Sequence, residues 1–75
     1  MHMSSEYVRE GPYLAIVDIH MIDSGRELAP HIPLLVPSDG GKAQLEAVRA
    51  ALKARDLAGA ARLSTLYELQ PVAAE

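Results

Sequence analysis

Three side chains have the chemistry to form a metal or acid–base site, namely Asp18, His20 and His31. Asp18 and His20 would share one face of a strand, because side chains alternate along β-structure, and His31 could lie on a paired strand opposite them. Two imidazoles and a carboxylate are a plausible zinc ligand set, and a carboxylate can also orient a histidine for proton transfer. A small enzyme or metal-binding protein is therefore one alternative for this chain.

A plainer interpretation of the same residues outweighs the chemical one. Asp18 and His20 are residue types that are common on the solvent-exposed face of a half-buried strand, and His31 is also suited to a loop. Their spacing matches no characteristic ligand motif, and no group can be named that would orient either imidazole. We therefore expect no bound metal and no cofactor.

The segment Ser38-Asp39-Gly40-Gly41 lies where a helix is expected to begin. Free amides at such a position can bind phosphate, but the segment lacks the glycine-rich fingerprints and the lysine–serine pair of a P-loop, so an ordinary cap is favoured. No serine or threonine lies in a nucleophile-elbow context, and a chain this short has difficulty enclosing a substrate cleft. We expect no enzyme.

Basic residues gather in the second half of the chain. Between Lys42 and Arg62 there are five basic and two acidic residues, whereas between Met3 and Gly41 there are two basic and six acidic ones. Four basic side chains could line one helical edge and contact nucleic-acid phosphates: Arg49, Lys53, Arg55 and Arg62. The net charge of −3, the lack of Phe and Trp for base stacking, and the lack of a helix-turn-helix pattern disfavour this alternative.

The chain has 75 residues and no cysteine, which predicts one small domain without disulfides or thiolate metal sites. Because such a chain hides only about 60% of its unfolded surface, a partner subunit is the remaining means of added stability. Met1 and His2 are interpreted as a cloning remnant, and residues 3–75 as the domain. No apolar stretch is long enough for a bilayer and no signal-peptide pattern opens the chain, so we expect a soluble cytoplasmic protein.

The most clearly patterned segment is Tyr13–Ile22, which predicts a strand between the breakers Gly11-Pro12 and the turn signal Asp23-Ser24-Gly25. One face of this strand is wholly apolar and is expected to pack on the core: Tyr13, Ala15, Val17, Ile19 and Met21. On the other face Leu14, Ile16 and Ile22 surround Asp18 and His20, so that face is expected to be partly wet.

The flanking segments predict shorter elements. Residues 6–9 could form a short strand that pairs with 13–22, and the prolines limit 32–36 to a short edge strand, which leaves 23–30 as a long hairpin loop. Helices are predicted over 42–54, capped by Ser38 or Asp39, and over 57–63, capped by Asp56, although one unbroken helix is an alternative. A final strand is predicted within residues 64–72.

These elements predict an α+β fold in the order (β)ββααβ. One long and one short helix would pack on one face of an antiparallel sheet of three short strands, or four with residues 6–9. Among the tyrosines, Tyr13 and Tyr67 are expected in the core and Tyr7 on the surface.

The other face of this sheet would stay partly uncovered, which favours a second copy or a larger protein as the cover. The candidate protein-interface residues are Tyr7, Leu14, Ile16, Ile22, Arg26 and Ile32. The sequence therefore favours a small non-catalytic interaction protein, such as a regulator, an inhibitor or an accessory subunit, acting as a homodimer or on a larger protein.

Overall fold

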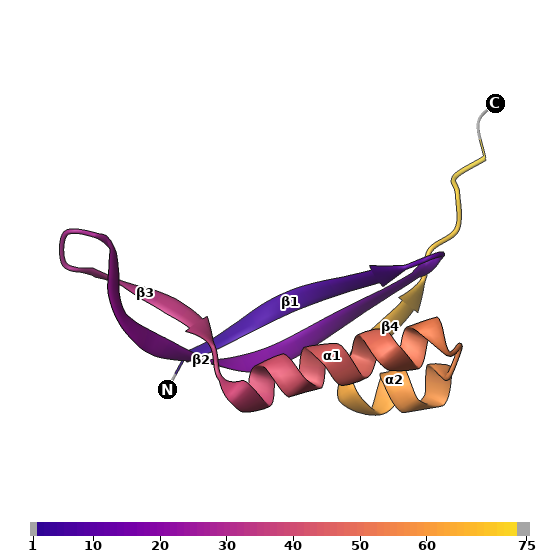
Figure 1. The fold of residues 1–75 in the computed structure, drawn as a ribbon. Helices are drawn as coiled ribbons and strands as arrows, with labels where there is room; N and C mark the ends of the chain where they lie inside the picture. The colour runs from indigo at the N-terminus through magenta and orange to yellow at the C-terminus, as the bar shows by residue number, and fades with distance from the viewer. Residues whose placement is uncertain (1, 74–75) are drawn as a thin grey trace.

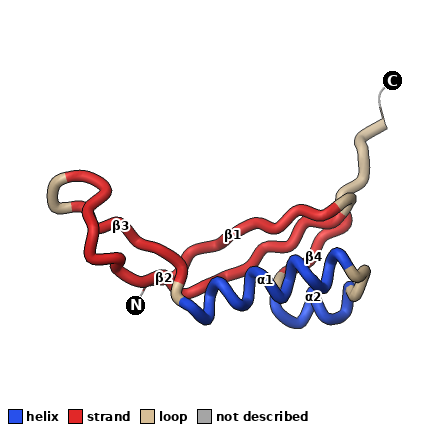
Figure 2. The backbone as a smooth tube through the Cα atoms, in the orientation of Figure 1, coloured by secondary structure: helices blue, strands red, loops and turns tan. Residues whose placement is uncertain are grey.

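One long strand organises the fold. The computed structural model describes residues 2–73, in which β2 pairs antiparallel with β1 along one edge and with β3 and β4 at opposite ends of the other edge (Figure 1). The elements are β1 (His2–Glu10), β2 (Tyr13–Ala29), β3 (Ile32–Pro37), α1 (Asp39–Lys53), α2 (Leu57–Leu63) and β4 (Thr65–Glu68). Both helices lie on the same side of the sheet (Figure 2). The predicted α+β fold is confirmed, with four strands.

The core lies between the helices and the helix-facing side of β1 and β2. Alternate residues of β2 point into it, and Val17 and Ile19 are 0% and 1% exposed. The predicted apolar face of this strand is confirmed, because Tyr13 and Met21 also pack against the cluster. The buried cluster consists of Val8, Ala15, Val17, Ile19, Val48, Leu52 and Ala60.

A close approach to the backbone of β2 sets the start of α1. The Ser38 backbone N–H donates to the His20 carbonyl at 2.9 Å, and the Ser38 hydroxyl accepts from the Gly41 N–H at 3.0 Å as the N-cap. A β-carbon on Gly41 would lie 3.1 Å from the His20 carbonyl oxygen and 3.2 Å from the Ile19 Cβ. Glycine at this position therefore lets the first turn of the helix pack directly on the strand.

The two helices are separate, which decides between the two alternatives predicted for this region. The Asp56 N–H donates to the Ala51 carbonyl at 2.8 Å and the Arg55 N–H to the Leu52 carbonyl at 3.1 Å, with Arg55 at a φ of +58°. This is the hydrogen-bond pattern of a Schellman C-cap, in which glycine is the usual left-handed residue. Asp56 then caps α2 by accepting from the Gly59 N–H at 3.0 Å.

β1 is longer than predicted. It spans nine residues, and its register with β2 is unbroken from the pair His2–Met21 to the pair Glu10–Tyr13. The first part of this strand was not predicted because it contains polar residues such as Ser4 and Ser5. An edge strand does not need an apolar pattern along its whole length. The turn to β2 contains only Gly11 and Pro12.

The predicted loop over residues 23–30 is wrong, because β2 continues to Ala29 and only Pro30 and His31 separate it from β3. The turn signal at Asp23-Ser24-Gly25 forms a bulge instead. Gly25 takes a φ of +78°, and its N–H donates to the Asp23 carboxylate at 2.8 Å. The Ser24 hydroxyl donates to the Leu34 carbonyl at 2.7 Å and so rejoins the two strands after the bulge.

Residues 22–37 form a two-stranded projection, here termed the distal arm. It extends past the end of the helical layer, and none of its residues is buried (Figure 1). The large side chains of Leu28 and Ile32 are 71% and 51% exposed. In the described part of the chain neither helix is long and apolar enough to span a membrane.

The last strand is shorter than predicted and turns Tyr67 outward. Its register places Leu66 opposite Ala15 on the helix side and Tyr67 opposite Leu14 on the other side. Tyr67 is 49% exposed, so its predicted place in the core is wrong, whereas the predictions for Tyr7 and Tyr13 are confirmed. The chain after β4 is held at its start by a hydrogen bond from the Leu69 N–H to the Pro12 carbonyl at 2.6 Å.

Candidate functional site

The sheet surface that the helices leave uncovered is here termed the open face. Its side chains alternate with those of the core along each strand, so strand register places them in cross-strand rows. One row contains Tyr7, Ile16 and Thr65. The next row toward the Gly11-Pro12 turn contains Arg9, Leu14 and Tyr67. On the other side of the Ile16 row, the next row contains Ser5 and Asp18. The row after that contains Met3 and His20.

The central part of the open face is apolar. Tyr7 is 66% exposed, and Leu14 and Ile16 are half-buried between it and Tyr67. Ile22, farther along the same strand face, is 50% exposed. Large aromatic and aliphatic side chains gathered on one surface are typical of the centre of a protein–protein interface.

Two charged groups flank this apolar centre. The Asp18 carboxylate accepts a hydrogen bond from the Ser5 hydroxyl at 2.5 Å, which holds it toward β1. On the other side of the Ile16 row, the Arg9 Nε donates to the Gly11 carbonyl at 2.8 Å. Both charged side chains are exposed. The open face therefore has an apolar centre with a cation beside it on one side and an anion on the other.

The six predicted interface residues fall into two groups. Tyr7, Leu14 and Ile16 lie at the centre of the open face, and Ile22 lies on the same face of β2 at the base of the distal arm. Arg26 and Ile32 lie farther along the arm, near its tip. Arg9 and Tyr67 also belong to this surface, although neither was among the predicted interface residues. Alternation along β1 puts Arg9 on the same face as Tyr7, whereas the place of Tyr67 depends on the pairing of β4 with β2.

The structure does not bring the predicted metal or acid–base set together. Asp18 and His20 lie on the open face, but His31 lies in the turn at the tip of the arm and not on a strand opposite them. Nine strand residues separate His20 from the turn, about 30 Å of extended chain. Within residues 2–73 no group of three His, Asp or Glu side chains could hold a metal ion.

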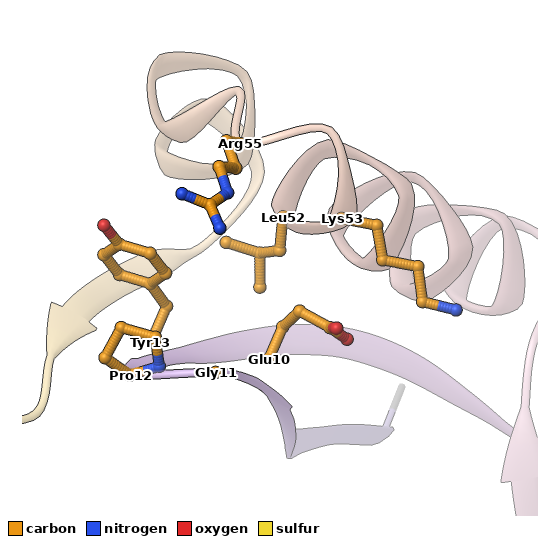
Figure 3. Close-up of a pocket in the computed structure, with 7 residues that line it drawn as sticks. All are labelled: Glu10, Gly11, Pro12, Tyr13, Leu52, Lys53 and Arg55. Carbon is orange, nitrogen blue, oxygen red and sulfur yellow. The ribbon is translucent and has the colours of Figure 1, made fainter.

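A shallow cleft of about 340 Å³ lies between the β1–β2 turn and the C-terminal end of α1 (Figure 3). The Arg55 side chain extends from the helix junction toward Tyr13, and Lys53 and Glu10 line the same cleft. With Glu10 among the lining groups, the two cations do not form a purely basic site.

The four residues of the predicted basic edge do not form one line. Arg49 and Lys53 lie on one exposed flank of α1. The opposite flank faces α2, because the Gln44 amide donates to the Leu63 carbonyl at 3.0 Å and Gln44 lies about 180° around the helix from Lys53. Arg62, on α2, is therefore on the far side from Lys53, and Arg55 lies in the cleft at the helix junction.

Comparisons of this chain with known protein families, curated proteins and solved structures find no match. What can be inferred about its function rests on the open face, the cleft and the charges described above.

Proposed function

We propose that the chain is a small non-catalytic protein-interaction module that binds another protein molecule through its open face. A regulator, an inhibitor or an accessory subunit would work in this way, with either a second copy or a larger protein as the partner. The observation that carries the proposal is the apolar centre of the open face, where Tyr7, Leu14, Ile16 and Tyr67 lie together without a covering layer.

The size of the exposed surface supports the proposal. The chain exposes 5656 Å², whereas a compact monomer of 8.1 kDa is expected to expose about 4,500 Å². Its radius of gyration is 15.3 Å, compared with about 11 Å for a compact domain of this length. Tyr7 and Tyr67 on the open face, at 66% and 49% exposed, and the distal arm, in which no residue is buried, contribute to this excess. Covering the open face would remove part of it from water.

The charge distribution favours protein over nucleic acid as the partner. The apolar open face carries the exposed aromatic side chains, while the four residues of the predicted basic edge are divided between two flanks of the helical layer and one cleft. Nucleic-acid binding would require several cations along one surface to contact successive phosphates. The flank with Arg49 and Lys53 remains the part of the chain that a nucleic-acid-binding alternative would use.

The test compares Tyr7→Glu with Arg49→Glu. Both side chains are exposed, so both variants are expected to fold, but one lies on the open face and the other on the helical layer. Tagged wild-type and variant chains are recovered from cells, treated with nuclease, and sized by light scattering. We expect Tyr7→Glu to reduce the complex by at least about tenfold, because a buried charge without a partner is costly, and Arg49→Glu to leave it unchanged.

The opposite pattern would contradict the proposal. A salt-sensitive complex that nuclease removes, and that Arg49→Glu abolishes while Tyr7→Glu does not, would favour the nucleic-acid-binding alternative. A lone chain of 8.1 kDa under all conditions would leave the open face without a partner and would also contradict it.

A further inference from the structure

We propose that the partner on the open face is a second copy of this chain, packed face to face about a two-fold axis that runs along the row of Tyr7, Ile16 and Thr65. This inference rests on the proposed function and specifies both the partner and the register. The two copies would form a sandwich of two sheets with the helical layers outside. Aligned sheets pack in this way about 10 Å apart with interdigitating side chains.

The extra exposed surface of the chain, to which the distal arm also contributes, is larger than the area that a standard interface buries on one partner. The chain exposes about 1,150 Å² more than a compact monomer of its mass, and a standard interface buries about 800 Å² on each partner. The apolar centre can also meet itself, because a two-fold interface requires each patch to be complementary to its own copy. The axis row brings Ile16 onto Ile16 of the second copy, with the Tyr7 side chains beside this contact.

The charges of Arg9 and Asp18 favour an axis along the Ile16 row over an axis along either adjacent row or along β2. An axis along the Leu14 row would place Arg9 against its own copy, and an axis along the Asp18 row would place two carboxylates together. An axis along β2 instead of across it would also stack Asp18 on itself, since Asp18 lies on the central strand. Like charges brought together in an interface oppose association.

With an axis along the Ile16 row, Arg9 of each copy lies near Asp18 of the other, and this contact between opposite charges is attractive. The rows on either side exchange places, so the Arg9 row of one copy lies over the row of Ser5 and Asp18 in the other. β1 lies over β1, which brings Arg9 above Ser5 of the second copy. The Asp18 carboxylate already lies toward that strand through its hydrogen bond with the Ser5 hydroxyl at 2.5 Å. Each dimer would therefore contain two symmetric pairs of Arg9 with Asp18.

Charge reversal tests this register. Sedimentation equilibrium of the purified chain is measured for wild type, Arg9→Glu, Asp18→Arg, the double variant and the control Arg49→Glu. Each single reversal creates two like-charge contacts, so it is expected to raise the dimer dissociation constant by at least about tenfold. The double variant restores both pairs with their signs exchanged and is expected to return close to wild type, and Arg49→Glu is expected to match wild type.

A mixture of the two single variants gives a second readout. In a mixed dimer, the introduced glutamate meets the introduced arginine, and the native Arg9 of one chain meets the native Asp18 of the other. We therefore expect Arg9→Glu and Asp18→Arg to be weakly associated alone and to form a dimer when mixed. Native mass spectrometry with one chain isotopically labelled would identify the mixed species, and circular dichroism would show that each variant is folded.

Two results would overturn the inference. A wild-type dimer that is insensitive to the single reversals, or that is not restored in the double variant or the mixture, would show a different interface. A wild-type monomer at all concentrations would show that the second copy is not the partner. In that second case, a larger complex from cells that Tyr7→Glu still abolishes would leave the proposed function standing.

Discussion

Replacement of Ile19 by alanine is expected to lower the free energy of unfolding by about 2–5 kcal/mol, the range measured for truncation of buried Ile and Leu side chains. Ile19 is 1% exposed and packs beneath the first turn of α1. A chain of this length is expected to have a total stability of about 4–11 kcal/mol, so this loss would consume much of it. Urea titration followed by circular dichroism measures the change.

Ile22→Ala provides the matched control, because it is the same substitution on the same strand. Ile22 is 50% exposed and lies beyond the helical layer. At a protein concentration low enough to prevent association, we expect it to cost less than about 1 kcal/mol. Equal losses at the two positions would mean that Ile22 is buried within a single chain, which would contradict the arrangement of the core under the helices.

The two halves of β2 are expected to differ in amide hydrogen exchange by at least about a hundredfold at low protein concentration. The half from Tyr13 to Ile19 lies under the helices, and its amides should exchange only when most of the chain unfolds. The half from Ile22 to Ala29 belongs to the distal arm, which contains no buried residue. A two-stranded ribbon of this kind is only marginally stable in water.

Nuclear magnetic resonance measures the exchange rate of each amide in β2, so the half under the helices serves as the control for the half in the distal arm. Bonds such as that from the Ser24 hydroxyl to the Leu34 carbonyl hold the arm locally but do not protect its backbone by burial. Uniform protection from Tyr13 to Ala29 would contradict this account. It would mean that the arm unfolds together with the core as one cooperative unit.

The sequence predicted those parts of the fold whose signals are local. The alternation of apolar residues from Tyr13 to Met21 identified the central strand and its core face. The first helix followed from its periodicity and from a cap at Ser38 or Asp39, and a separate second helix was one of two alternatives, based on the cap at Asp56. These signals depend on side-chain spacing and on nearby hydrogen bonds. They can therefore be recognised without knowledge of the tertiary fold.

The errors lie where local signals have two meanings. Asp23-Ser24-Gly25 has the composition of a turn, but a bulge also uses a left-handed glycine and a side chain that accepts from the backbone, and here the strand continues. The outward position of Tyr67 depends on its pairing with Leu14, a contact between distant parts of the sequence. The same reason explains why Tyr67 was not predicted on the open face.

The predicted site residues also differ in whether local signals were enough to place them. Tyr7, Leu14 and Ile16 share one surface because strand alternation and adjacent pairing bring them together. His31 could lie opposite His20 only if β2 ended near Ile22 and a loop followed it. The longer β2 instead carries His31 to the tip of the arm, and Asp18, His20 and His31 do not form a single site.

The central claim is that the open face contacts another protein molecule, and photo-crosslinking in cells tests it most directly. A benzoylphenylalanine is introduced in place of Tyr7 on the open face, or in place of Arg49 on the helical layer as the control. We predict a nuclease-resistant protein adduct from position 7 and little or none from position 49. No adduct from position 7, or equal adducts from both positions, would contradict the account.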